Sequence, residues 1–202
     1  IETWVAGADG CPGGWVVVLH PLGHPDRAEI HICKNFADLL KLEPAPQFIA
    51  IDMPIGLPES AIRGGRPADV AVRAVLGDRK SSVFAVPARA AVACGQYREA
   101  CAVALEHSEP PRKISKQSFM LLPKIREVDE LMSPALQRRV FEVHPEAAFW
   151  ALNGEKPLPL PKKVKSRPFP DGMKLRKKLL RAAGYDTAAV DATDIPHRIA
   201  GQ

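Results

Sequence analysis

Two short apolar segments, each ending on an aspartate, place the strongest constraint on this chain. The first reaches Asp9 and then Gly10, and the second reaches Asp52 with Pro54 close behind. Apolar runs of this length, bounded by Gly or Pro, are typical of buried strands. Ligands of open α/β sheets bind beyond the carboxyl ends of the strands. If the two strands are parallel neighbours, Asp9 and Asp52 face one crevice.

The length and composition favour a single globular domain over residues 1–202. The chain is 46% hydrophobic and 25% charged, with a net charge of +5, which suits a polyanionic partner without requiring one. No apolar run approaches the length of a membrane span, so we expect no membrane segment. The four cysteines form no C-x-x-C pair, and no secretory signal is visible. We therefore expect a reducing, cytoplasmic location.

The first quarter of the chain predicts four strands and one helix. A helix over 35–41, with Asn35 as its N-cap, precedes the strand that ends on Asp52. A helical crossover allows that strand to lie parallel to the first. Short connections join the three earlier strands into an antiparallel meander. These strands are expected at 2–9, 15–19 and 28–33.

The region 54–139 differs in character, and we expect a helical insertion or cap over the strand ends. After it, residues 139–144 alternate as a fifth strand, with Glu142 and His144 on one face. The insertion is expected to contain helices at 68–76, 90–107 and 118–131 and a strand at 83–86. The remaining elements are expected as a helix at Pro145–Leu152, an exposed loop at 157–170 and a basic helix at 172–183.

This order of elements is typical of the ribonuclease H-like architecture. It is an α/β fold with a mixed five-stranded sheet, in which three antiparallel strands are followed by parallel ones. Helices flank the sheet. The expected insertion at 54–139 lies within this single domain.

Three carboxylates, on Asp9, Asp52 and Glu142, are candidate metal ligands and catalytic groups at the ends of predicted strands. Converging carboxylates repel one another, and a hard divalent cation such as Mg²⁺ or Mn²⁺ relieves the repulsion. Two such ions, roughly 3.5–4 Å apart, activate water and stabilise the leaving oxygen of a phosphodiester. For a single strand-end aspartate, a turn or helix cap is the alternative. Glu146 competes with Glu142 for its role, and His144 is either a proton-transfer group or a structural histidine.

Basic residues supply candidate contacts to substrate. Lys162, Lys163 and Arg176 belong to the main positive cluster, which suits backbone phosphates. A solvated face is the alternative. A second group follows the Asp52 loop and either faces the crevice or forms an internal Asp69–Arg73 ion pair. Its members are Arg66, Asp69, Arg73 and Lys80.

Several segments together resemble the family of bacterial and archaeal proteins labelled domain of unknown function 429, described as predicted ribonuclease H-fold nucleases. The resemblance implies the fold, implies nuclease activity less directly, and adds Gln117 and Lys124 to the candidate substrate contacts. The matching segments are 7–15, 51–57, 66–69 with Arg73, 82–87, 115–117, 123–125 with Asp129, 141–146, and the Lys-rich stretch leading to Gly172 and Arg176.

The C-terminal segment departs from that family's pattern, in which a last helix opens on an acidic run and supplies a further carboxylate. Here Asp191 and Asp194 are the available candidates for a metal ligand, and Pro196 interrupts a helix soon after them.

Three functions remain open at this stage. The first is a Mg²⁺- or Mn²⁺-dependent phosphodiesterase or nuclease. The second is a nucleotide-binding phosphotransferase or ATPase-like protein on a related sheet, and the third is a non-catalytic nucleic-acid-binding module whose metal site has decayed. The expected partner is accordingly a nucleic acid or a nucleotide.

Overall fold

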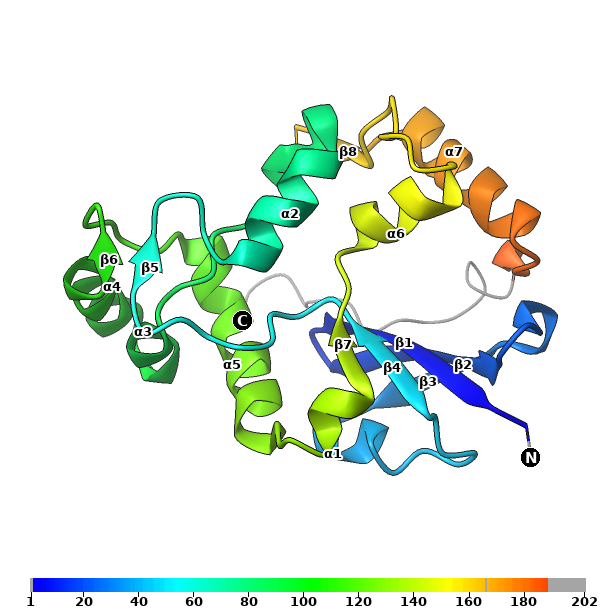
Figure 1. The fold of residues 1–202 in the computed structure, drawn as a ribbon, viewed down its shortest axis with the longest axis horizontal. Coiled ribbons are helices and arrows are strands. Elements are labelled where there is room, and N and C mark those ends of the chain that lie inside the picture. Colours follow the sequence, from blue (N-terminus) through cyan, green and yellow to red (C-terminus); the bar gives the residue numbers. More distant parts are fainter. Residues whose placement is uncertain (1, 166, 189–202) are drawn as a thin grey trace.

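The structure is a computed structural model that describes residues 2–165 and 167–188. Its centre is a five-stranded sheet in the order β3-β2-β1-β4-β7 (Figure 1). The first three strands are antiparallel, whereas β4 pairs parallel with β1 and β7 pairs parallel with β4. The mixed sheet predicted from the sequence is therefore confirmed. The strands are β1 (Trp4–Cys11), β2 (Gly14–Pro21), β3 (Glu29–Cys33), β4 (Phe48–Ile51) and β7 (Val140–Glu142).

The helix before β4 forms as the local sequence requires. Helix α1 spans Phe36–Leu39, and the Asn35 side chain accepts a hydrogen bond from the backbone N of Asp38 at 2.8 Å. This cap satisfies one of the free amides of the first turn. The helix connects edge strand β3 to inner strand β4, so the chain crosses over and β4 enters parallel to β1.

Alternation along the strands gives the sheet two different faces. Ala6 and Ala8 of β1 are buried with Ile49 and Ile51 of β4, whereas Asp9 points to the opposite face. The buried face packs against α1 and α5 (Lys116–Leu131), and the other face lies toward α6 (Pro145–Leu152) and α7 (Pro170–Ala182) (Figure 1).

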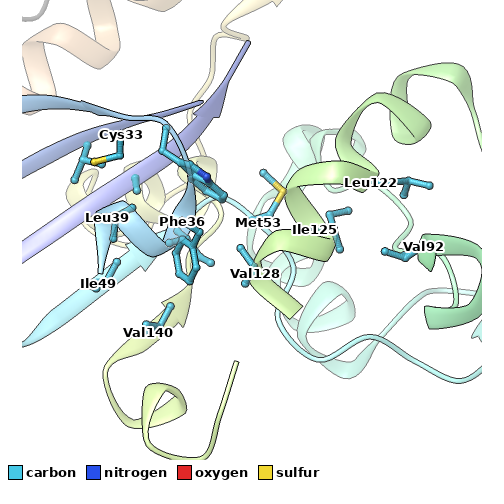
Figure 2. Packing of buried hydrophobic residues seen from close by; sticks show 14 of the residues in the cluster. Cys33, Phe36, Leu39, Ile49, Met53, Val92, Leu122, Ile125, Val128 and Val140 are labelled. Atoms are coloured by element: carbon cyan, nitrogen blue, oxygen red, sulfur yellow. The ribbon is translucent and has the colours of Figure 1, made fainter. Parts of the chain in front are cut away.

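Between β4 and β7 the chain forms a helical region with a small parallel sheet of its own. One continuous core joins this region to the main sheet: Figure 2 shows Met53 between Phe36 and the Ile125 and Val128 side chains of α5. The elements here are β5 (Ala61–Ile62), α2 (Pro67–Val75), the 3₁₀ helix η2 (Gly77–Ser82), α3 (Arg89–Ala93), α4 (Tyr97–Glu106), β6 (Ser108–Glu109), α5, and the 3₁₀ helix η3 (Leu136–Arg138).

Sequence predictions for the helical region and for the loop after α6 were wrong in three places. The single helix expected at 90–107 is two helices, α3 and α4, separated by a break that contains Gly95. The strand expected at 83–86 does not form, because the carbonyls of Val83 and Phe84 accept hydrogen bonds from Arg73 rather than from a neighbouring strand. The loop expected at 157–170 contains a short antiparallel pair, β8 (Lys163–Val164) and β9 (Arg167–Pro168).

The remaining short element is the 3₁₀ helix η1 (Pro25–Arg27), between β2 and β3. In the described part of the chain, no helix combines the length and apolar character needed to cross a membrane.

Candidate active site

Asp9 and Asp52 lie side by side at the carboxyl edge of the parallel strands. Ala8 is in register with Ile51, and the backbone N of Asp52 donates a hydrogen bond to the Ala8 carbonyl at 3.0 Å. Because the residues before them are buried on the core face, both aspartates project to the opposite face. Both line one pocket of about 450 Å³ formed by the described residues. The predicted convergence of these two side chains is therefore present in the fold.

Burial raises the pKa values of both carboxyls, and at Asp52 the charge of Asp9 raises the pKa further. Burial is the main cause at Asp52, and the charges of Asp9 and Glu142 add to it. Against the opposing charge of Lys162, they raise the pKa of Asp52 to about 6. Burial also raises the pKa of Asp9, while the Gly10 amide and the charge of Lys162 oppose the increase. By solvent exposure Asp9 is the more open of the two. A cation at this position would relieve the repulsion and favour both ionised carboxylates.

Glu142 ends β7 beside Ile51, but its carboxylate is engaged elsewhere. Arg66 donates to it from both terminal nitrogens, Nη2 to Oε1 at 2.5 Å and Nη1 to Oε2 at 2.8 Å. The backbone N of Ile55 donates to the same Oε2 at 2.9 Å. In residues 2–165 and 167–188, no group of three or more His, Cys, Asp or Glu side chains is arranged to hold a metal ion. The described carboxylates thus form a close pair, with the predicted third ligand in an ion pair.

Arg66 and Asp69 form a buried unit that fixes Glu142. Asp69 accepts from Arg66 Nη2 at 2.7 Å and from the Arg66 backbone N at 2.9 Å. Arg66 Nη1 also donates to the Ile55 carbonyl at 2.9 Å, so the guanidinium joins the start of α2 to the loop after Asp52. The Asp69 carboxylate pairs with Arg66, whereas Arg73 donates to backbone carbonyls.

His144 and Glu146 lie at the start of α6. His144 was expected on strand 139–144, but β7 ends at Glu142 because Pro145 opens the helix, and His144 is its N-cap. His144 Nδ1 accepts from the Glu146 backbone N at 3.2 Å, and burial lowers the pKa of the imidazole. The neutral ring with its proton on Nε2 fits these contacts, with the Ser82 carbonyl 3.4 Å away. A role of His144 in proton transfer stays a prediction.

Glu146 and Arg176 pair with each other inside the protein. Arg176 Nη2 donates to Glu146 Oε1 at 2.6 Å and to Oε2 at 2.7 Å, and both residues are buried. The guanidinium also lies 5.5 Å from the centre of the Phe149 ring. This pair ties α6 to α7, so the side chains predicted for catalysis and for phosphate binding are engaged in packing.

The remaining predicted substrate contacts are spread over the surface. Lys124 lies beside the end of β1: its Nζ pairs with Glu127 Oε2 at 3.1 Å, and a Cβ placed on Gly10 would lie 3.5 Å from its Cγ. Lys162 is exposed, and its charge lowers the pKa values of both Asp9 and Asp52. Three further candidates are also exposed: Lys80, Gln117 and Lys163. The candidate ligands Asp191 and Asp194 lie outside the described residues.

Sequence reasoning missed the wall of the pocket beside the aspartates. Val16, Val18 and His20 of β2 point to the same face as Asp9, and Tyr185 closes the far end. The alternation of β2 was visible in the sequence and could have assigned its three residues to this face. Tyr185 has no comparable signal, because only the turn after α7 brings it there.

Comparison with known proteins gave one match. A family model described as "Protein of unknown function (DUF429)" matches residues 7–200. The searches of curated proteins and of solved structures returned no match.

Proposed function

The chain belongs to the DUF429 family of proteins of unknown function, and we propose that it is a divalent-metal-dependent phosphodiesterase of the ribonuclease H-like nuclease type. The proposal rests on one observation, the Asp9–Asp52 pair at the carboxyl edge of parallel strands β1 and β4. Two adjacent carboxylates whose pKa values are raised form a donor set that suits Mg²⁺ or Mn²⁺.

The chain's own residues would divide the work as follows. Asp9 and Asp52 hold the cation, which when bound activates water and stabilises charge on a phosphoryl oxygen. Lys162, whose charge acts on both carboxyls, contacts the phosphate of the substrate. Arg66 and Glu142 hold the loop that follows Asp52, through the backbone N and O of Ile55. Because the loop is fixed, the Asp52 carboxylate is held in one position.

A non-catalytic nucleic-acid-binding module is the second candidate. The Arg66–Glu142 ion pair favours it, because Glu142 then supplies no ligand and the described residues offer only two carboxylates. Metal binding separates the two candidates, since only the phosphodiesterase needs a cation at Asp9 and Asp52.

We predict that Asp9→Asn abolishes Mn²⁺- or Mg²⁺-dependent cleavage, because it removes one carboxylate of the pair. The measurements are hydrolysis of bis(p-nitrophenyl) phosphate and of labelled oligonucleotides, with Mn²⁺ affinity from titration calorimetry. Glu43→Gln is the matched control, since Glu43 is an exposed carboxylate in the loop that leads into the opposite end of β4. Full activity in Asp9→Asn would refute the proposal. A wild-type protein that binds no Mn²⁺ would favour the non-catalytic module.

A further inference from the structure

We infer that the pocket next to Asp9 and Asp52 is a nucleobase subsite, selective for bases that carry an exocyclic amino group. This inference rests on the proposed function, because it assigns the substrate class of the same site. The pocket holds about 450 Å³, within the range of small-ligand sites. A base in this pocket would leave its attached phosphate at the mouth, where the two aspartates lie.

The walls of the pocket suit a flat, uncharged ring. On one side is the pleated face of the sheet, with Val16 and Val18 of β2, Ile30 of β3 and Ala50 of β4. The opposite wall includes Leu180 of α7. Aliphatic side chains on a sheet face offer a broad contact surface but no hydrogen bonds, so orientation must come from the rim.

The far end of the pocket is closed by residues from distant parts of the sequence. Gly184 has φ +91° and turns the chain after α7, and a Cβ there would lie 2.9 Å from the Pro25 ring. Tyr185 then meets His20: the hydroxyl lies 3.1 Å from Nε2, and the two rings contact edge-on. His20 Nδ1 lies 2.8 Å from the Pro21 carbonyl, so Nδ1 donates there and Nε2 accepts from Tyr185. These two polar groups satisfy each other and form a fixed end wall.

Charge at the rim decides which ring fits. Asp26 and Asp186 line the pocket in addition to Asp9 and Asp52, and the lining residues that the structure describes include no Lys or Arg. A free anion is therefore disfavoured away from a metal at the aspartate pair. Carboxylates accept hydrogen bonds and repel carbonyl oxygens, so the rim favours a ring edge that carries an amino group, as adenine, cytosine and guanine have, over the carbonyl oxygen that hypoxanthine has in the place of adenine's amino group.

Other small ligands fit these features less well. A quaternary ammonium ion requires several aromatic faces, whereas Tyr185 and His20 are the only aromatic rings among the described lining residues. An acyl chain makes no hydrogen bonds to the rim carboxylates, and its binding would remove water from their charges at a cost in free energy. A nucleobase uses the apolar walls, the acidic rim and the nearby metal position together.

The test is calorimetric titration of the full chain, metal-free in EDTA, with adenosine, inosine and choline. Adenosine and inosine differ at the amino position, so we expect adenosine to bind about tenfold more tightly through a charge-assisted hydrogen bond. Val18→Trp should abolish adenosine binding while Mn²⁺ binding persists. Ile32→Trp is the matched control, because Ile32 lies on the same sheet face but outside the pocket lining. Asp186→Asn and Asp26→Asn should each reduce the preference for adenosine over inosine.

Equal affinity for the two nucleosides, tighter binding of choline, or adenosine binding that survives Val18→Trp would overturn the subsite. So would a protein that binds no nucleoside, or a dimer that Val18→Trp dissociates, since a second copy would then fill the pocket. Nucleoside binding without any Mn²⁺-dependent cleavage would instead refute the phosphodiesterase and leave the subsite standing. The two failures are therefore distinguishable.

Discussion

At the scale of single residues, Asp9 and Asp52 differ from ordinary strand-end aspartates in having each other as neighbours. An isolated aspartate at a strand end caps a turn and keeps its charge in water. Here the parallel register brings two of them together, and burial adds to their repulsion. The pair therefore destabilises the fold when both carboxyls are ionised, and perturbed carboxyls in a pocket are typical of functional sites.

A pH dependence of stability follows from the raised pKa of Asp52. The folded protein holds the Asp52 proton up to about pH 6, whereas the unfolded chain loses it near 3.8. The folded state therefore binds more protons between these values, and the free energy of unfolding falls as the pH rises through this window. We expect Asp52→Asn to be more stable than wild type at pH 7.5 by about 1–2 kcal/mol, less than the full linkage value because solvent screens the half-buried carboxyl.

The measurement is urea unfolding of the metal-free protein at pH 3.5 and pH 7.5. At pH 3.5 the two proteins should have nearly equal stability, because Asp52 is then largely protonated in both states. Glu43→Gln serves as the control for the loss of an exposed carboxylate. A stabilisation of Asp52→Asn that is equal at both pH values would contradict the ionisation argument.

At the scale of elements, ion pairs with at least one buried partner connect segments that the hydrophobic core does not join directly. Arg66 at the start of α2 holds Glu142 at the end of β7, and Arg176 of α7 holds Glu146 of α6. The pairs lie in partly or fully dry surroundings, so removing one partner leaves a charge without compensation. These contacts set the positions of the loops and helices around the aspartate pair.

We predict that Arg66→Met lowers the free energy of unfolding by about 3 kcal/mol, because Asp69 and Glu142 both lose their partner. Arg89→Met is the matched control: Arg89 pairs with Asp129, but its side chain is 46% exposed, so we expect a loss below about 1 kcal/mol. Both values come from urea unfolding followed by circular dichroism. Equal losses in the two variants would show that the Arg66 cluster has no special role.

At the scale of the whole molecule, the sheet and the helical region at 54–139 share one core. The buried cluster runs from Cys33 and Ile49 in the sheet through Met53 to Val92 and Ile125 in the helices (Figure 2). A contiguous core of this kind is expected to unfold in a single step. The cap is then a separate stretch of the sequence, but it does not unfold separately from the rest of the domain.

Ile125→Ala tests this expectation, because Ile125 is fully buried between the two parts. We predict that the cavity lowers the free energy of unfolding by about 2–5 kcal/mol. Hydrogen-exchange protection should then fall equally at amides of β1 and of α4. Hydrogen exchange read by mass spectrometry in low urea reports both elements, and Val70→Ala on the exposed surface of α2 is the control. Loss of protection in α4 alone would mean that the helical region unfolds independently.

The sequence by itself determined the strand order, the α1 crossover and the placement of Asp9 and Asp52 at one sheet edge. These features depend on local signals: alternation, N-caps, and Gly or Pro after an apolar run. Only the tertiary structure decided that Arg66 pairs with Glu142, and that His20 meets Tyr185, residues 165 positions apart. Which charge meets which partner depends on positions that the whole fold sets, since no short-range pattern encodes contacts between residues so far apart in the chain.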